Sequence, residues 1–340
     1  MKPILGITIG DPAGVGPEVS VKACVDAGVR NICRPLLIAG RPILENALHI
    51  CDIAAVLRRI DAPSELADAP ETLDYIEVET GVDTPPTAGT LSAVAGEAAF
   101  QYILTAIRLA LAGDIHGVVT APINKEALHL AGHRYSGHTE IFSQYTDTRR
   151  YAMLLASESL RVIHVTTHVA LRRACEMITA DRVHETIVLG SEALRSMGVA
   201  GKIAVAGLNP HSSENGLFGD EETSAIIPAI ARAQGEGIDV IGPEPPDTVF
   251  VKALSGEYAM VVAMYHDQGH IPFKLAGFHV DNNGVTSVRG VNCTLGLPII
   301  RTSVDHGTAF DKAGKNTADA GSMIDALRMA AAMAKTKFGL

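Results

Sequence analysis

The sequence contains no tryptophan, and only 4% of its 340 residues are aromatic. It also lacks an excess of positive charge: 28 lysines and arginines stand against 38 aspartates and glutamates, for a formal net charge of −10. This balance argues against a nucleic-acid groove, because binding a phosphate backbone requires a basic face. With 47% hydrophobic and 19% charged residues, the composition is typical of a compact globular enzyme.

A disulfide framework and a membrane anchor are also absent from the sequence pattern. The cysteines are odd in number and form no C-x-x-C pair, which favours reduced thiols in a cytoplasmic protein. They are Cys24, Cys33, Cys51, Cys175 and Cys293. The start, MKPILGITIG, has one lysine and a short apolar run broken by glycine, so it predicts a first strand and not a signal peptide. We expect no membrane span.

Two phosphate-binding fingerprints are missing as well. The loop GDPAGVGPE has its glycines in the order G-x-x-x-G-x-G, with Pro12 inside it, and so fails the Rossmann pattern. No G-x-x-x-x-G-K-[ST] phosphate loop occurs. A nicotinamide cofactor, if this protein uses one, is therefore not held in the usual Rossmann turn.

Short apolar runs alternate with helical patterns along the whole chain. Strands are expected at 4–9, 35–39, 116–120, 160–166, 203–208, 261–264 and 297–300, and helices at 17–27, 91–112, 121–130 and 323–337. The alternation predicts an α/β fold with a mainly parallel sheet and helices on both faces, and the length favours two packed lobes. Ligands of such folds bind beyond the carboxyl ends of the strands.

Three histidines follow strand-like runs: His168 in VIHVTTHVAL, His211 in AVAGLNPHSSENG and His266 in VVAMYHDQG. Neutral imidazoles suit zinc, cobalt or iron-type divalent ions, and three of them leave a coordination position open. Each histidine alone could be an ordinary loop residue, but three at equivalent positions favour a metal site. Nearby, Asp267 and Asp247 could be ligands, orienting partners or a base. A further histidine, His164, is expected in the core or behind the ligands.

A cationic cluster accompanies the histidines in sequence. Lys274 ends the segment that begins at His266, and Arg301 follows the expected strand 297–300, with Arg289 and Asn292 before it. Most lysines and arginines lie on solvated surfaces, but these two are expected on the ligand side of the sheet. Charge-assisted hydrogen bonds to phosphate are each worth roughly 1.5 to 3 kcal/mol. We therefore expect Lys274 and Arg301 to hold a phosphorylated substrate.

The stretch Gly137-His138-Thr139-Glu140 has two interpretations. It could begin a helix, with Thr139 as the cap and Glu140 in the first turn. A helix start with free amides and a hydroxyl is also an anion site. Spacing alone leaves both open.

Several motifs in combination resemble one known family from about residue 4 to about residue 330. They are GDPAGVGPE, GHTE, TTHVALR, LNPHSSENG, HDQG and VNCTLGLPIIRTSVDHGTAFDKAGK. Together they resemble 4-hydroxythreonine-4-phosphate dehydrogenase and its close relatives. The resemblance implies an isocitrate/isopropylmalate dehydrogenase-like fold, with the active site in the cleft between two α/β lobes. With that architecture we expect lobes at 1–130 plus 296–340 and at 131–295.

The resemblance also implies roles for individual residues. His168, His211 and His266 would bind one divalent metal at a homodimer interface, with zinc as the first candidate and magnesium, cobalt or manganese as alternatives. His138 and Thr139 would contact the substrate, and Lys274, Asn292 and Arg301 would bind its polar and phosphate groups. The loop with His306, Gly307, Thr308, Ala309 and Gly314 would hold the adenosine part of NAD or NADP.

The implied reaction is oxidation of a secondary alcohol followed by β-decarboxylation. Where the vitamin-pathway enzyme typically continues HDQG with Leu-Pro, this chain has HDQGHIP, and the segment 279–290 is longer than expected. The HDQGHIP form resembles the branch acting on 4-phospho-threonate or 4-phospho-erythronate, and also dihydrodiol dehydrogenases of aromatic breakdown. A phosphate acyltransferase on a similar fold, or a non-catalytic homologue, are the rival interpretations. We expect no nucleic-acid or membrane partner.

Overall fold

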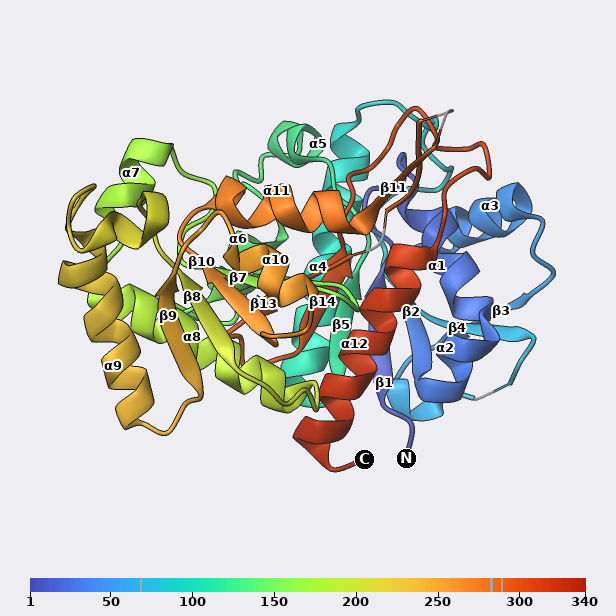
Figure 1. Cartoon of the computed structure of the whole chain (residues 1–340). Helices are drawn as coiled ribbons and strands as arrows, with labels where there is room; N and C mark the ends of the chain where they lie inside the picture. The colour runs from blue at the N-terminus through green and yellow to red at the C-terminus, as the bar shows by residue number, and fades with distance from the viewer. Residues whose placement is uncertain (68, 282–283, 289) are drawn as a thin grey trace. The chain divides into compact units, whose positions relative to one another are not determined.

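The computed structural model describes residues 1–67, 69–281, 284–288 and 290–340, with backbone alone in the strands of 278–288. The chain divides into two compact units (Figure 1). The first comprises Met1–Arg149, Ser287–Val291 and Leu297–Leu340, and the second Arg150–Thr286 and Asn292–Gly296. The first unit thus runs past the expected boundary at residue 130. The rings of His133, Tyr135 and Tyr145 explain this, since all three pack against Phe100 of the first unit.

The strands of the first unit pair in parallel, in the order β3-β4-β2-β1-β5-β14. Its strands are β1 (Ile4–Thr8), β2 (Arg34–Ala39), β3 (Val56–Ile60), β4 (Thr72–Glu77), β5 (Gly117–Thr120) and β14 (Arg301–Val304). Every residue of β1, β5 and β14 is buried, as expected of central parallel strands covered on both faces.

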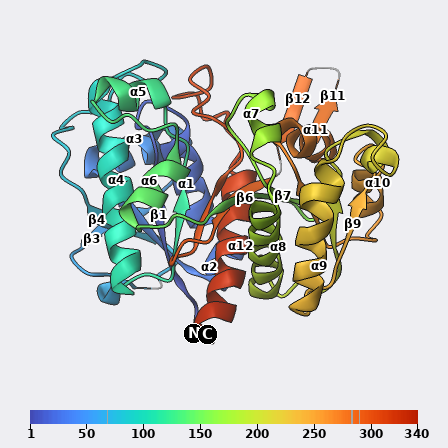
Figure 2. The same cartoon turned by 90° about the vertical axis from the view of Figure 1, so that its left-hand side faces the viewer.

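Helices cover this sheet (Figure 2). They are α1 (Gly16–Val25), α2 (Ala27–Ile32), α3 (Arg41–Cys51), α4 (Ala93–Ala112), α5 (Lys125–Leu130), α6 (His138–Tyr145) and α12 (Gly321–Phe338). Helix α4 starts where the Ser92 hydroxyl accepts the Ala95 N–H, and it ends at Gly113, which adopts the left-handed conformation. The helix expected from residue 121 begins only at Lys125, because Asn124 provides its cap.

Helix α4 is the one described helix long and apolar enough to cross a membrane, contrary to our expectation of no such stretch. Length and composition alone are weak evidence, because buried helices of globular domains have the same properties. More than half of its apolar window is buried inside the structure. We therefore interpret α4 as a core helix of the first unit.

The second unit has a mixed sheet with strand order β13-β6-β7-β10-β8-β9. Its strands are β6 (Ala152–Ala156), β7 (Arg161–His164), β8 (Ile203–Ala206), β9 (Val240–Glu244), β10 (Met260–Ala263) and β13 (Val291–Leu295). Strands β7, β10, β8 and β9 run parallel, whereas β6 is antiparallel to β7. A separate pair consists of β11 (Phe278–Asp281) and β12 (Gly284–Val288). The predicted mainly parallel α/β fold is confirmed.

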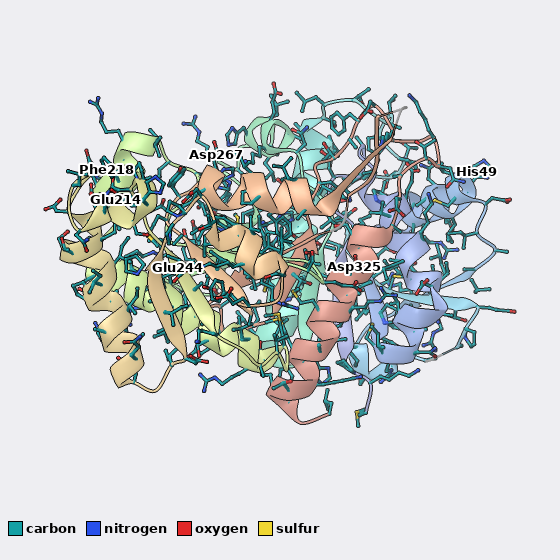
Figure 3. All side chains as sticks on the ribbon, viewed as in Figure 1. His49, Glu214, Phe218, Glu244, Asp267 and Asp325 are labelled. Carbon is teal, nitrogen blue, oxygen red and sulfur yellow. The ribbon has the colours of Figure 1, made fainter. Side chains whose placement is uncertain are left out.

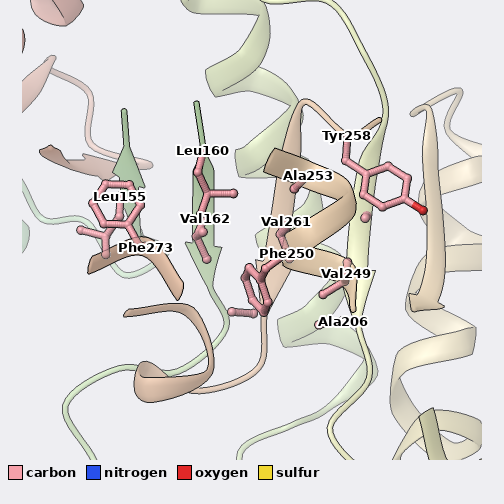
Figure 4. Packing of buried hydrophobic residues seen from close by; sticks show 12 residues of the cluster. Leu155, Leu160, Val162, Ala206, Val249, Phe250, Ala253, Tyr258, Val261 and Phe273 are labelled. Atoms are coloured by element: carbon pink, nitrogen blue, oxygen red, sulfur yellow. The ribbon is translucent and has the colours of Figure 1, made fainter. Parts of the chain in front are cut away.

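The helices of the second unit include α11, which carries much of the predicted site. They are α7 (Leu171–Glu176), α8 (Ala180–Ser196), α9 (Ile227–Gly235), α10 (Val249–Leu254) and α11 (His266–Gly277). Phe273 of α11 is fully buried in a cluster with Leu155, Val162 and Phe250 (Figure 4). This apolar anchor fixes α11 on the sheet and with it the polar residues along the helix.

Two expected segments differ from the structure near the site. Residues 297–300 do not form a strand; the strand begins at Arg301, because Gly296 is left-handed and Pro298 cannot donate to a ladder. The segment after β10 is helix α11 and not a loop, although Pro272 lies inside it.

Candidate functional site

A row of histidine rings lies beyond β7 and β10 in the second unit. The ring centroids of His168 and His266 are 5.5 Å apart, and the His266 ring stacks on that of His270 at 3.6 Å with an interplanar angle of 11°. His164 lies 4.7 Å from His270. A pocket of about 370 Å³ is lined by His168, His266 and Asp267, among others. The structure therefore brings two of the three predicted metal ligands together at one pocket.

The side chain of Asp267 bonds the ring of His266. It lies at the start of α11 (Figure 3), and its Oδ1 accepts a hydrogen bond from Nδ1 of His266 at 2.6 Å. Metal-binding histidines commonly donate one ring N–H to a carboxylate, which fixes the tautomer and leaves the other nitrogen for the metal. The contact uses Nδ1 of His266 and not Nε2, an arrangement that fits Asp267 as an orienting partner.

His211 does not join the pair. Its Nδ1 lies 4.0 Å from Oδ1 of Asp247, an ion-pair distance and not a hydrogen bond. Within the described part of the chain, no three His, Cys, Asp or Glu side chains form a group that could hold a metal. The expected convergence of three histidines is therefore not formed by the described residues of one chain.

The reason lies in the local backbone of His211. Residues 211–215 all have positive φ, a conformation that costs non-glycine residues roughly 1 kcal/mol or more each. The buried carboxylate of Glu222 holds the preceding turn, accepting the N–H groups of Leu208 and Asn209 at 2.8 Å each. Sequence periodicity does not indicate such a run, so the direction of the His211 side chain could not be predicted.

Two further histidines, one buried and one half-buried, lie next to the pair. His164 is fully buried, and burial lowers its pKa to about 3, with neighbouring His270 adding to the effect. Burial, then the charge of His266, lowers the pKa of His270 to about 4. Both rings are thus neutral near pH 7. His164 fits its expected place behind the ligands, whereas sequence reasoning did not select His270; its spacing of four residues from His266 on a helix was the available signal.

In the first unit, Arg301 lies beside His138, and Thr139 follows His138 on α6. Arg301 is buried, donates to Oγ1 of Thr120 at 2.8 Å, and lies 5.6 Å from the Phe142 ring. Burial, and then the Arg301 charge, hold the pKa of His138 well below its usual range. Although Arg301 begins β14, its long side chain reaches the last residue of β5, which is the carboxyl end of that strand.

The start of α6 settles part of the open question about Gly137-His138-Thr139-Glu140. Gly137, not Thr139, occupies the cap position, and Thr139 lies in the first turn. Nε2 of His138 is buried without a hydrogen-bond partner among the described residues. A buried nitrogen without a partner is costly, so it fits a polar ligand. Beside the Arg301 guanidinium, that ligand would carry negative charge.

The remaining predicted substrate residues lie in the second unit. Lys274 is on α11, two helical turns beyond His266, and Asn292 is on β13. Oδ1 of Asn292 is buried with no hydrogen-bond partner among the described residues, as a ligand-binding amide would be. Arg289 lies outside the described residues.

The predicted cofactor loop follows β14 at its carboxyl end in the first unit. Nδ1 of His306 bonds the Gly307 carbonyl at 2.9 Å, and the Thr308 carbonyl accepts the Val15 N–H at 3.0 Å. A side chain built on Gly307 would meet no atom within 4 Å, so the backbone there faces open space. Ala309 and Gly314 have positive φ. An open loop with exposed backbone groups fits a dinucleotide bound outside a Rossmann turn.

Comparison with known proteins decides the family. Residues 31–330 match the family described as Pyridoxal phosphate biosynthetic protein PdxA. The chain belongs to this family. It is 46% identical to the D-threonate 4-phosphate dehydrogenase of Salmonella typhimurium, covering 97% of this chain and 98% of the relative. It is also 46% identical to the 4-hydroxythreonine-4-phosphate dehydrogenase of Desulfosudis oleivorans, covering 97% and 95%.

Solved structures agree with this membership. A 4-hydroxythreonine-4-phosphate dehydrogenase from Burkholderia phymatum superimposes with a TM-score of 0.84 at 47% identity, covering 98% of both chains. The predicted enzyme class, an oxidoreductase acting on a CH–OH group, is thus confirmed, because the relatives are named dehydrogenases. A dehydrogenase family implies a nicotinamide cofactor.

Proposed function

We propose that this protein oxidises the secondary hydroxyl of a 4-phosphorylated four-carbon hydroxy acid with NAD or NADP, and that the product then loses carbon dioxide. The single observation that carries the proposal is the ring pair of His168 and His266, oriented by Asp267 at one pocket, in a chain of this family. D-threonate 4-phosphate and 4-hydroxythreonine 4-phosphate are the two candidate substrates, since relatives named for each are equally similar.

Two imidazoles of the second unit would form part of a divalent-metal site. His168 and His266 would supply two imidazole nitrogens, and His211 would complete the set across a homodimer interface. Imidazole ligands favour zinc, with cobalt or manganese next and magnesium last, because magnesium prefers oxygen. When bound, the metal would lower the pKa of the substrate hydroxyl, and the nicotinamide would accept a hydride.

The chain's own residues would move the proton and hold the substrate. Asp247 is half-exposed and could accept the hydroxyl proton, while Asp267 is already bonded to His266. Transfer of hydride to the nicotinamide from the carbon that bears this hydroxyl then gives a carbonyl β to the carboxylate. The bond to that carboxylate breaks, carbon dioxide leaves, and the bonding electrons pass to the carbonyl oxygen.

The phosphate would be held by cations remote from the reacting carbon. Arg301, beside His138, supplies a buried guanidinium in the first unit. Lys274 on α11 is the second candidate cation, and Asn292 on β13 is a candidate amide for the substrate's polar groups. Charge-assisted bonds of this kind are worth roughly 1.5 to 3 kcal/mol each, and that energy positions the reacting carbon. The loop from His306 to Ala309, with Gly314, would hold the adenosine part of the cofactor.

A homodimer in the cytoplasm completes the proposal. Helix α11 presents Ile271 and Leu275, one turn apart, with 57% and 77% of their surface exposed. Contiguous exposed apolar patches mark interaction surfaces, and we infer that this pair belongs to one covered by a partner. All five cysteines are free thiols, which suits a reducing compartment.

A substrate screen tests the proposed function. The purified protein is incubated with D-threonate 4-phosphate, 4-hydroxythreonine 4-phosphate or 4-phospho-erythronate, with zinc and NAD or NADP. We expect reduced nicotinamide by its absorbance and an equal amount of carbon dioxide, both lost when a chelator removes the metal. Reduction without carbon dioxide would contradict the decarboxylation.

The screen also separates the proposal from its rivals. A solved terephthalate 1,2-cis-dihydrodiol dehydrogenase from Burkholderia xenovorans shares the fold at 27% identity and a TM-score of 0.68. Reduction of nicotinamide with an unphosphorylated cis-dihydrodiol, and not with the phosphorylated acids, would assign the protein to that activity instead. Acyl transfer to phosphate without metal or nicotinamide would indicate the acyltransferase.

A further inference from the structure

The loop GDPAGVGPE and the start of α1 take no part in the proposed chemistry, yet their polar groups are buried. Asp11 is 1% exposed, and its Oδ1 accepts the Ala13 N–H at 2.8 Å. Glu18, in the first turn of α1, is 2% exposed. Buried carboxylates are rare unless bonded, so these positions need a structural reason.

The glycine loop contacts the beginning of the cofactor loop. The Val15 N–H donates to the Thr308 carbonyl at 3.0 Å. At Gly14 a side-chain carbon would come within 2.9 Å of Cβ of Thr308 and 3.0 Å of its carbonyl oxygen. Only glycine therefore allows this backbone approach, which explains one glycine of the motif without any direct contact to a ligand.

Helix α1 contacts the other end of the same loop. The carboxylate of Glu18 accepts the Gly314 N–H at Oε1 (2.7 Å) and the Asn316 N–H at Oε2 (2.9 Å). One turn further on, Nζ of Lys22 donates to the carbonyls of Asn316 (3.3 Å) and Ala318 (2.8 Å). Two residues of α1 thus bond three alternate positions of the loop, 314, 316 and 318.

These bonds hold a backbone shape that the loop would not adopt by itself. Ala309, Gly314 and Asn316 all have positive φ, a conformation that is strained for the two non-glycine residues among them. Such conformations persist only where surrounding contacts enforce them. Glu18 supplies such contacts at two of these three residues, Gly314 and Asn316.

We infer that Glu18 is a positioning residue for the cofactor: its buried carboxylate fixes the loop 308–318 in the shape that receives the adenosine part of a nicotinamide dinucleotide. The inference rests on the proposed function, in which this loop binds that group. It also gives the GDPAGVGPE motif a structural role, although the motif does not match the Rossmann pattern. The motif does not touch the dinucleotide; it orders the segment that does.

The test compares Glu18→Gln with Asp74→Asn. Glu18→Gln keeps the size of the side chain but replaces one acceptor oxygen with an amide nitrogen that cannot accept. Asp74 is a matched control, because it is a buried carboxylate of the same unit that accepts the Ala67 N–H and an Arg58 bond away from the loop. The dissociation constant for NAD is measured by calorimetry, and amide exchange is followed at Gly314 and Asn316.

We expect Glu18→Gln to raise the dissociation constant for NAD by roughly tenfold, the effect of about one lost charge-assisted bond. The KM for NAD should rise in parallel while kcat and the KM for the phosphorylated acid stay within about twofold. Exchange at 314 and 316 should accelerate without NAD present. Asp74→Asn should lower the melting temperature and leave both NAD binding and this exchange unchanged.

The outcomes separate the inference from the proposed function. Wild-type protein that binds neither NAD nor NADP would refute the proposed function. Wild-type binding with an unchanged constant in Glu18→Gln would refute the role of Glu18 alone. If Glu18→Gln does not fold, Lys22→Met decides: it removes the bonds to the carbonyls at 316 and 318, and a several-fold weaker NAD affinity supports the inference, whereas wild-type affinity overturns it.

Discussion

The side chain of Gln268 bonds the carbonyl oxygen of Gly207, to which its Nε2 donates at 2.8 Å. Its Oε1 accepts the Met264 N–H at 2.6 Å, and the residue is 9% exposed. Gly207 follows β8 and leads to His211, while Met264 follows β10 and precedes His266. One buried amide therefore couples the two segments that carry these histidines, which explains the glutamine of HDQG.

Substituting Gln268 should weaken metal binding without removing a ligand. Gln268→Leu leaves the Met264 N–H and the Gly207 carbonyl buried without their partner and frees the two segments to shift. Loss of a group that supports metal ligands typically costs 10 to 100-fold in affinity. We expect a decrease of about that size in zinc affinity, measured by competition with a chelator of known affinity.

A matched control is Gln234→Leu in the same unit. Gln234 also donates its side-chain amide to a backbone carbonyl, that of Val240 at 2.8 Å, but holds no histidine segment. It should leave zinc affinity unchanged. Equal zinc affinity in Gln268→Leu and the wild type would show that the coupling has no part in metal binding.

Replacing Arg301 should discriminate between phosphorylated and unphosphorylated substrates. Arg301→Ala removes the buried guanidinium beside His138 and should raise the KM for the phosphorylated acid by at least tenfold, given about 1.5 to 3 kcal/mol for a bond to phosphate. Steady-state kinetics with the acid and its unphosphorylated form measure the effect. The ratio of kcat/KM between the two should collapse toward one.

Arg30→Ala controls for the loss of a hydrogen-bonded, half-buried arginine. Arg30 donates to three backbone carbonyls of the first unit, those of Cys24, Ala69 and Thr72. None of these carbonyls belongs to the predicted site, so Arg30 stabilises the fold of this unit. We expect lower stability with an unchanged ratio. An equal loss of activity toward both substrates in Arg301→Ala would contradict the phosphate role of this residue.

The fold could be predicted from the sequence where a segment is buried on both faces. The apolar runs at 4–9 and 35–39 became β1 and β2 within a residue at each end, because a central parallel strand reads as one hydrophobic stretch. The run 297–300 is equally apolar, yet it is no strand. The left-handed Gly296 and Pro298 prevent pairing, and the ladder starts at Arg301.

The site could be predicted only in part. His168 and His266 were recognised because each follows a strand, and the structure brings them together. The direction of His211 depends on a run of positive φ angles, and the position of His270 beside His266 depends on α11 forming across Pro272. Both are tertiary outcomes. The bonds from Glu18 to residues about 300 positions away leave no trace in local sequence patterns.

The exposed face of α11 should prove to be a dimer contact. Ile271→Asp combined with Leu275→Asp places two charges on that face, and burying an unpaired charge is strongly unfavourable. We expect a monomer by sedimentation and, because His211 would then lack its partner site, loss of stoichiometric zinc. Phe338→Asp, which also changes an exposed apolar residue, serves as the control. A double variant that stays dimeric would place the contact elsewhere.

The buried carboxyl of Asp11 should make stability depend on pH in a direction unusual for an aspartate. Burial raises its pKa from 3.8 to about 6, with only the Ala13 N–H opposing this, and Oδ2 has no hydrogen-bond partner among the described residues. The folded state therefore binds this proton more tightly than the unfolded state. Between about pH 4 and pH 6 stability should fall as pH rises, and the penalty is complete above pH 6.

Asp11→Asn removes this dependence, since the amide cannot ionise and its oxygen can still accept the Ala13 N–H. A shift from 3.8 to about 6 corresponds to about 3 kcal/mol. The variant should match the wild type near pH 4 and exceed its free energy of unfolding by up to that amount at pH 7. Urea titrations from pH 4 to pH 7, with chelator present so that metal does not contribute, measure the difference. A gap that stays constant across this range would mean that Asp11 keeps an ordinary pKa in the folded protein.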